Sequence, residues 1–304
     1  MAKTFKSLLG DDAANTRTLL HEAIPITGTI VSGTYSSAHV ANNIKTFSHG
    51  MFTSVYDYPF LSSSANHIFD ITYGHSPEAS SSARYPALMS QGAKKLNIYN
   101  QMAQTLMGYD VTGNIRLFDS DGTLDDSTSI MNHCFFLNFT RLLTKDEIKK
   151  NSFRMSLYTS GSVINRKTNT TIGDYASANE FRTSPAGVYG LLFTSSVGAS
   201  GPLGNAASVG LVFYQAGVAV ISSSIFDAGV AYTPSTSAAL IAAGGVREFG
   251  PPGGMTGTGS VSNAVVSGTI TQLANGLRHR IDDIDFNNTI ELNSAIYFCR
   301  INHN

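Results

Sequence analysis

The chain has 304 residues, of which 42% are hydrophobic, so it can bury a sizeable core and is not a disordered protein. Only 13% of the residues are charged and the formal net charge is −1, so the basic face of a nucleic-acid-binding protein is missing. A surface this poor in charge predicts burial against other subunits, and we expect an oligomer with no nucleic-acid partner.

The sequence predicts no membrane segment and no cofactor. No apolar run reaches the roughly 18 residues that span a bilayer, and the first twenty residues have no secretory apolar stretch. We therefore expect a protein made and assembled in the cytoplasm. Cys134 and Cys299 lie in apolar, strand-like segments without the neighbours of a zinc site or a redox pair, and we expect both to be buried.

The N-terminal part, residues 1–50, is predicted to be an arm and an extended segment, with a short helix near residues 14–22. The next part, residues 51–232, is predicted to be a β-rich core, since Ser, Thr, Asn, Gly, Tyr and Phe are abundant. Its clearest helix spans residues 86–108, because Pro86 suits a first helical position and Gly108 suits a helix stop. Apolar residues recur on one face of this helix at Met89, Leu96, Tyr99, Ala103 and Leu106.

Short apolar segments separated by Gly, Ser and Asn follow the helix and predict antiparallel hairpins. Residues 233–266 are rich in Gly, Ser and Pro and predict a long loop excursion. Residues 267–304 are expected to form a helix around 269–280 and a strand that returns to the core. The predicted fold class is therefore mainly β with a few helices (α+β), with antiparallel sheets in a sandwich-like core and extended arms.

The stretch LFDSDGTLDDS, residues 117–127, resembles the aspartate motif of haloacid-dehalogenase-type phosphatases. In that family Asp119 would be the nucleophile and Asp121 the general acid, with Mg²⁺ bound nearby. The further groups required would be Thr159 or Ser160, Lys167 and Asp174. These lie within about fifteen residues of one another, whereas the family needs them at the ends of separate parallel strands.

We therefore interpret Asp121 and Gly122 as a tight turn between two strands, a common use of an Asp-Gly pair. The phosphatase with Asp119 and Asp121 stays open as an alternative, as does a surface cation site through Asp119, Asp121, Asp125 and Asp126. Otherwise the sequence predicts no catalytic or metal-binding residue and no small-molecule substrate.

Four blocks of the sequence resemble virion structural proteins of contractile-tailed phages, particularly those of cyanobacteria and other marine bacteria. The blocks are SSAHVANNIKTFSHGMFTSVYDYPFLSSSANHIFDITYG, KKLNIYNQMAQTLMG, FFLNFTRLLTKDEIKKNSFRMSLY and AIYFCRINHN, scattered over roughly half of the chain. The resemblance implies a non-enzymatic tail, baseplate or neck subunit in the virion, whose partners are copies of itself and neighbouring virion proteins.

In such a subunit, extended termini would clasp neighbours by adding strands to their sheets, and aromatic residues would act as interface anchors. The candidate interface residues are Tyr56, Tyr58, Pro59, Phe60 and Phe298. A third alternative is a receptor- or glycan-binding surface module that uses loops at residues 195–207 and 233–266.

Overall fold

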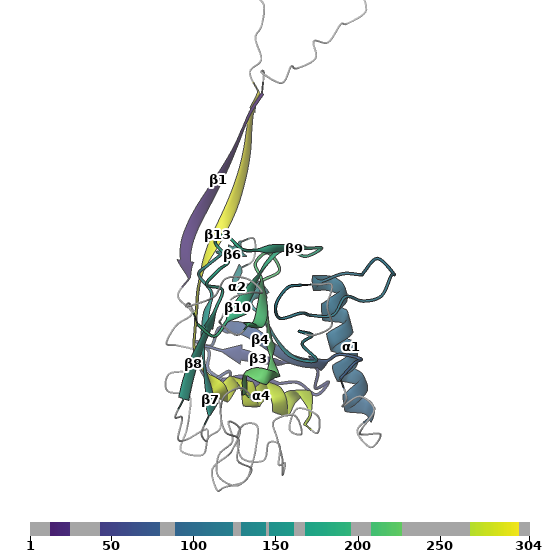
Figure 1. Ribbon diagram of the computed structural model, residues 1–304. Coiled ribbons are helices and arrows are strands. Elements are labelled where there is room, and N and C mark those ends of the chain that lie inside the picture. Colours follow the sequence, from purple (N-terminus) through teal and green to yellow (C-terminus); the bar gives the residue numbers. More distant parts are fainter. Residues whose placement is uncertain are drawn as a thin grey trace, which may run out of the picture.

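The computed structural model describes residues 13–24, 43–79, 89–123, 129–143, 146–160, 168–195, 208–226 and 268–297. These residues form a 13-stranded sheet in which every strand pairing is antiparallel (Figure 1). The predicted fold class, mainly β with a few helices, is confirmed.

The strands are β1 (Ala13–Ile24), β2 (Ile44–Thr46), β3 (Thr53–Tyr56), β4 (His67–His75), β5 (His133–Asn138), β6 (Glu147–Ile148), β7 (Arg154–Ser160), β8 (Thr168–Gly173), β9 (Arg182–Ser184), β10 (Gly187–Phe193), β11 (Ser208–Phe213), β12 (Val218–Ser222) and β13 (Ile281–Tyr297). The helices are α1 (Met89–Leu106), α2 (Thr140–Leu143), the 3₁₀ turn η4 (Ser223–Phe226) and α4 (Ile270–Arg280). Neighbouring strands follow the order β1-β13-β7-β8-β10-β11-β12-β5-β4-β3-β2, with β6 on β13 and β9 on β10.

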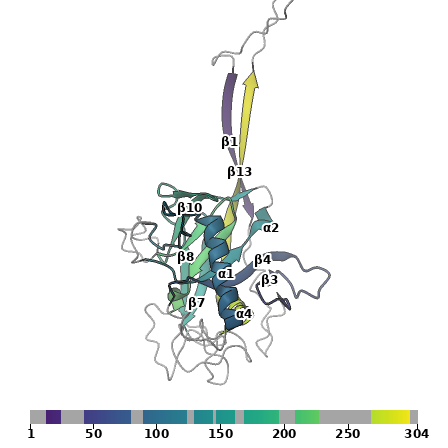
Figure 2. The same cartoon turned by 90° about the vertical axis from the view of Figure 1, so that its right-hand side faces the viewer.

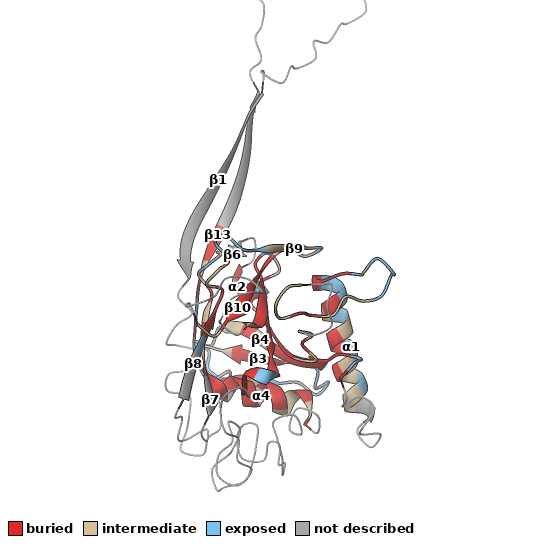
Figure 3. Cartoon of the chain, viewed as in Figure 1, coloured by how far each residue is buried: buried red, intermediate tan, exposed pale blue. Residues whose placement is uncertain are grey.

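The central strands are buried on both faces, which explains their continuous apolar runs (Figure 3). In β5, Phe135 and Leu137 belong to one core cluster, whereas Cys134 and Phe136 belong to another. The first cluster also takes residues from α4 and from β4, β7 and β13, so the sheet bends around it and gives the sandwich-like core. The second cluster lies between the sheet and α1.

Helix α1 confirms the helix predicted between residues 86 and 108 over its described part. Gly108 ends it with φ of +78°, a left-handed conformation that favours glycine, and its N–H donates to the Ala103 carbonyl at 3.0 Å. Leu96 of the predicted apolar face is only half-buried. The buried positions are Lys95, Ile98, Tyr99, Ala103 and Leu106, so the helix buries a lysine that the apolar pattern did not predict.

Helix α4 confirms the helix predicted around residues 269–280. It begins with a capping box: Gln272 N–H donates to Thr269 Oγ1 at 3.2 Å, and Thr269 N–H donates to Gln272 Oε1 at 2.9 Å. Leu273 and Leu277 pack into the first core cluster. The chain then passes directly into β13, so α4 fixes the root of that strand.

The helix predicted near residues 14–22 is wrong, because these residues lie in β1, which pairs with β13 along its whole length. Twelve paired positions outweigh a weak local helix preference, and β-branched Thr16 and Thr18 suit a strand. The predicted loop excursion at residues 233–266 lies outside the described residues and stays a prediction.

Candidate functional site

Strands β1 and β13 form a long two-stranded ribbon that extends away from the body of the molecule (Figures 1 and 2). Ala13 stands opposite Tyr297 at one end and Ile24 stands opposite Phe286 at the other. Near the body, β13 also pairs with β7 and β6, and the last β6 contact is at Asn288 and Thr289. The predicted extended arms are therefore present, but the two arms pair with each other.

Successive pairs of the ribbon belong to opposite faces, because residues of a strand alternate in direction. We call the apolar face the positions of Ala14, Thr16, Thr18 and Leu20 with Ile290, Leu292, Ser294 and Ile296. We call the polar face the positions of Ala13, Asn15, Arg17 and Leu19 with Glu291, Asn293, Ala295 and Tyr297. Both charged residues of these eight pairs therefore belong to the polar face.

Toward the body, Ile284 and Phe286 of β13 are fully buried in the first core cluster, and Asn288, two residues further along the strand, is buried as well. At the end of the ribbon Ile296 is 52% exposed and Tyr297 is 60% exposed. A two-stranded ribbon without further packing is marginal in water, so this arrangement is suited to contact with another surface.

The predicted aromatic anchors lie in and beside the loop between β3 and β4. Tyr56 ends β3 and is half-buried, with its ring 6.5 Å from that of Phe60. Tyr58 is 50% exposed and Pro59 is exposed. These four residues therefore share one surface region, whereas Phe298 lies outside the described residues. Their role at an interface stays a prediction.

Asp57 holds this loop in one conformation. Its Oδ1 accepts from the N–H groups of Tyr58 at 2.8 Å and Asn66 at 2.6 Å, and its Oδ2 accepts from Asn66 Nδ2 at 2.9 Å. The loop also presents Leu61, which is 87% exposed and which the sequence prediction missed. The available signal was its apolar type directly after the predicted anchor Phe60.

The aspartate motif forms part of a wider loop, so the predicted tight turn between two strands is wrong. Asp119 forms an isolated antiparallel β-bridge with Ile130, and next to it the Ser120 N–H donates to Ser129 O at 3.0 Å. The segment that connects these paired residues is therefore much longer than the two residues of a tight turn. Thr123 N–H donates to Asp121 Oδ1 at 2.8 Å, a local turn that Gly122 permits with φ of +73°.

The two carboxyl groups of the motif have opposite environments. Asp119 is 4% exposed, its Oδ1 accepts from Asp121 N–H at 2.9 Å, and burial raises its pKa to about 6. Burial alone would raise the pKa of Asp121, but hydrogen bonds from Ser129 and Thr123 outweigh it and lower the pKa to about 2. Asp125 and Asp126 of the predicted cation site lie outside the described residues.

The other phosphatase candidates do not gather around this loop at parallel strand ends. Thr159 and Ser160 belong to β7, whose described partners β8 and β13 are both antiparallel. Asp174 is fully buried and accepts from Arg154 Nη1 at 2.9 Å, from Ser177 Oγ at 2.8 Å and from Tyr214 Oη at 3.0 Å. These bonds tie β7 to the 174–177 turn and to Tyr214, the residue after β11. Lys167 lies outside the described residues.

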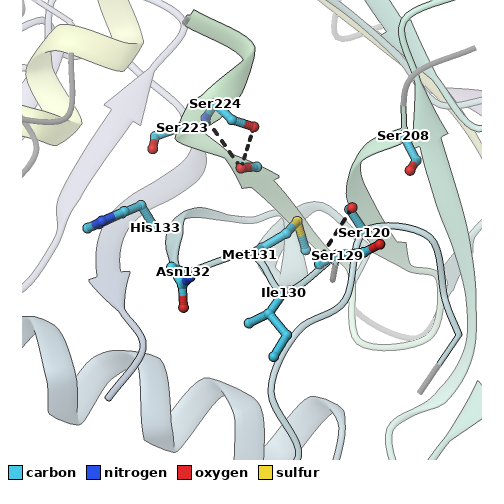
Figure 4. Close-up of a pocket in the computed structure, with 10 residues that line it drawn as sticks. Ser120, Ser129, Ile130, Met131, Asn132, His133, Ser208, Ser223 and Ser224 are labelled. Atoms are coloured by element: carbon cyan, nitrogen blue, oxygen red, sulfur yellow. Dashed lines mark hydrogen bonds between the residues drawn. The ribbon is translucent and has the colours of Figure 1, made fainter. Parts of the chain in front are cut away.

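A polar cavity of about 310 Å³ opens where β11 begins, β12 ends and β5 begins (Figure 4). Its lining residues are Ser120, Ser129, Ile130, Met131, Asn132, His133, Ser208, Ser222, Ser223 and Ser224. Ser222 and Ser224 hydroxyls lie 2.8 Å apart, and Ser120 Oγ donates to Ser129 O at 3.2 Å. Such a lining offers hydrogen bonds to a neutral polar group.

The histidine of this cavity is not arranged to activate a serine. In Figure 4 its ring extends away from the serines across the cavity, and His133 Nδ1 lies 2.7 Å from Tyr73 Oη. Burial, followed by the nearby His75 and Lys95, lowers the pKa of His133 to about 4, so the ring is neutral at pH 7. Over the described residues no hydrogen bond joins His133 to a serine hydroxyl, as nucleophilic catalysis would need.

The described residues hold neither a metal-binding cluster nor a helix suited to a membrane. No group of three or more His, Cys, Asp and Glu lies close enough to hold a metal ion in that part of the chain. Within the same part, no helix has the length and apolar character needed to cross a bilayer. Cys134 is buried as predicted, whereas Cys299 lies beyond the described ribbon.

The chain has no match among protein-family models, curated proteins or solved structures.

Proposed function

We propose that this chain is a structural subunit of a phage particle, in the tail, the baseplate or the neck, and that it acts by oligomeric assembly. Its partners are other copies of itself and neighbouring virion proteins, and it is assembled in the host cytoplasm. The resemblance of its sequence blocks to virion proteins of contractile-tailed phages supports the phage part of this proposal.

The ribbon of β1 and β13 is the observation that carries the assembly part. It pairs both ends of the described chain over twelve positions and extends beyond the globular body (Figure 1). Among the described residues, no other segment lies along the ribbon in either view (Figures 1 and 2), and Ile296 and Tyr297 at its end are exposed. A surface of this kind is stabilised by burial against another chain.

The surface of the body is consistent with the same function. Leu61 and Val111 are almost fully exposed, and Tyr58, Tyr109 and Phe181 are also exposed. With 13% charged residues in the whole chain, little charge would have to be desolvated when such surfaces meet.

Sedimentation velocity of the purified full-length chain over a wide range of concentrations tests the assembly. We expect discrete oligomers that grow at the expense of monomer as concentration rises, because association follows mass action. A folded chain that stays monomeric at high concentration would overturn the proposal.

Mass spectrometry of particles purified from the bacterium that carries the gene tests the phage part. The chain should co-purify with tailed particles in a fixed ratio to the other tail proteins. Its absence from intact particles, with abundant chain left in the soluble fraction, would contradict a virion role.

A further inference from the structure

We infer that a cavity beside α1, lined by the buried carboxyl group of Asp119, binds a cationic nitrogen group, an alkylammonium or a guanidinium. The cavity has a volume of about 820 Å³, which lies within the range of small-molecule sites. This inference goes beyond the proposed assembly function and does not depend on it.

Three segments of the described chain meet at this cavity. Helix α1 contributes Asn100, the turn after β4 contributes a proline and a glutamate, and much of the remaining lining comes from residues 110–119. Tyr99 of α1 ties the neighbouring segments together, because its Oη accepts from Phe118 N–H at 3.1 Å and donates to Met131 O at 3.0 Å. Hydrogen bonds within the folded chain therefore fix the walls, as a preformed site requires.

The side chain of Asp119 lies on the cavity side of its segment. Asp119 and Ile130 form an antiparallel bridge, and both line the cavity. Phe118, the residue before Asp119, is fully buried in the second core cluster. Neighbouring residues of extended backbone point to opposite sides, so Asp119 points away from that core and toward the cavity.

One oxygen of the Asp119 carboxyl group lacks a partner. Asp119 is 4% exposed, and its Oδ1 accepts from Asp121 N–H at 2.9 Å, whereas Oδ2 is buried and has no hydrogen-bond partner. Asn100 Oδ1, from the same lining, is also buried without a partner. Within the described residues, both unpartnered atoms of this lining are acceptors, so a ligand that offers donors satisfies them.

The balance of charge selects a cation over a neutral donor. The lining has the carboxyl groups of Glu78, Asp110 and Asp119 and one guanidinium, that of Arg116. Burial raises the pKa of Asp119 to about 6, so at pH 7.5 the group is mainly ionised and its charge is costly to bury. The ion pairs among the described residues join neither Asp119 nor Arg116 to another group. An ammonium or guanidinium group brings the opposite charge and only donors.

Two matched probes test the chemistry of the site in ligand-observed NMR titrations of the purified full-length chain at pH 7.5. Butylguanidinium carries the cationic group, and butylurea is a neutral molecule of nearly the same shape. We expect butylguanidinium to bind at least about tenfold more tightly, because hydrogen bonds between charged groups are stronger than neutral ones. Equal binding of the two probes, or no binding of butylguanidinium, would overturn the inference.

Three substitutions test the place of binding. Asp119→Asn should weaken butylguanidinium binding at least about tenfold, and thermal unfolding should show that this variant folds, since a buried charge is removed. Arg116→Gln removes the like charge and should strengthen binding about threefold. The control Asp285→Asn removes an exposed carboxylate from β13, which contributes none of the described lining residues, and should leave binding unchanged. Equal weakening by Asp119→Asn and Asp285→Asn would assign the binding to general surface charge and overturn the site.

Sedimentation velocity distinguishes two sources of the cationic group. If a lysine or arginine side chain of a second copy supplies it, both Asp119→Asn and excess butylguanidinium should weaken assembly at least about tenfold. If a free small molecule supplies it, assembly should stay unchanged while Asp119→Asn still loses the binding. Either result supports the cation site and identifies its source, whereas an unchanged chain that stays monomeric would overturn the proposed assembly function alone.

Discussion

The protein should be less stable at neutral pH with Asp119 than with asparagine at this position. Burial raises the pKa of Asp119 to about 6 from an ordinary 3.8. This difference of about two units corresponds to about 3 kcal/mol between the two protonation states. Because the folded protein prefers the protonated carboxyl, stability is lost as the pH rises from about 4 to about 6, and the full cost is present above that window.

Asp119→Asn removes this charge and keeps an oxygen that can accept from Asp121 N–H. We expect the variant to be more stable by about 1 to 3 kcal/mol at pH 7.5, and the gain to fall to about a third of that value near pH 4.5. The neighbouring carboxylate of Asp121, with a pKa of about 2, stays ionised throughout this range and does not confuse the titration.

Urea unfolding of both proteins at the two pH values measures this difference. Equal stability changes at both pH values, or a less stable variant at pH 7.5, would refute the reasoning from a buried charge. The same variant also bears on the phosphatase alternative, since a Mg²⁺-dependent phosphatase activity that Asp119→Asn abolished would favour that alternative.

Three further stability predictions follow from the core and the helices. Burial lowers the pKa of His133 from 6.5 to about 4, so the folded protein loses about 3 kcal/mol of stability as the pH falls through this window. This loss should be smaller in His133→Gln, which acid unfolding followed by circular dichroism would measure. Gly74→Ala should destabilise the protein by about 2 kcal/mol or more in urea unfolding, because the new Cβ would lie 2.8 Å from Tyr99 N. Gly92→Ala should instead stabilise it by about 0.5–1 kcal/mol, because Gly92 lies inside α1 with open space around it. Thr269→Ala should cost about 1 kcal/mol in the same assay because the capping box of α4 is lost, and an unchanged stability would contradict the cap.

The sequence was sufficient for the features that local rules determine. Gly108 and the apolar period of α1 predicted that helix, and α4 was predicted around residues 269–280, where Thr269 and Gln272 form its capping box. The antiparallel β-class followed from short apolar segments between turn residues. In each case the signal lies within a few residues of the element that it predicts.

The sequence could not predict the features that depend on pairing between residues far apart in the chain. The segment at residues 14–22 became a strand because its partner lies more than 250 residues further along, and no local pattern contains that register. The aspartate motif read as a tight turn, yet Asp119 pairs with Ile130 across a wider loop. Lys95 was not among the predicted apolar positions of α1, yet it is buried beside the ring of Tyr73, and burial lowers its pKa to about 8.

Cryo-electron microscopy of the assembled full-length chain, at a resolution that separates strands, tests the central claim most directly. We predict density for the ribbon of β1 and β13 against a neighbouring copy of the chain. Ribbons that extend into solvent on every copy would contradict the account.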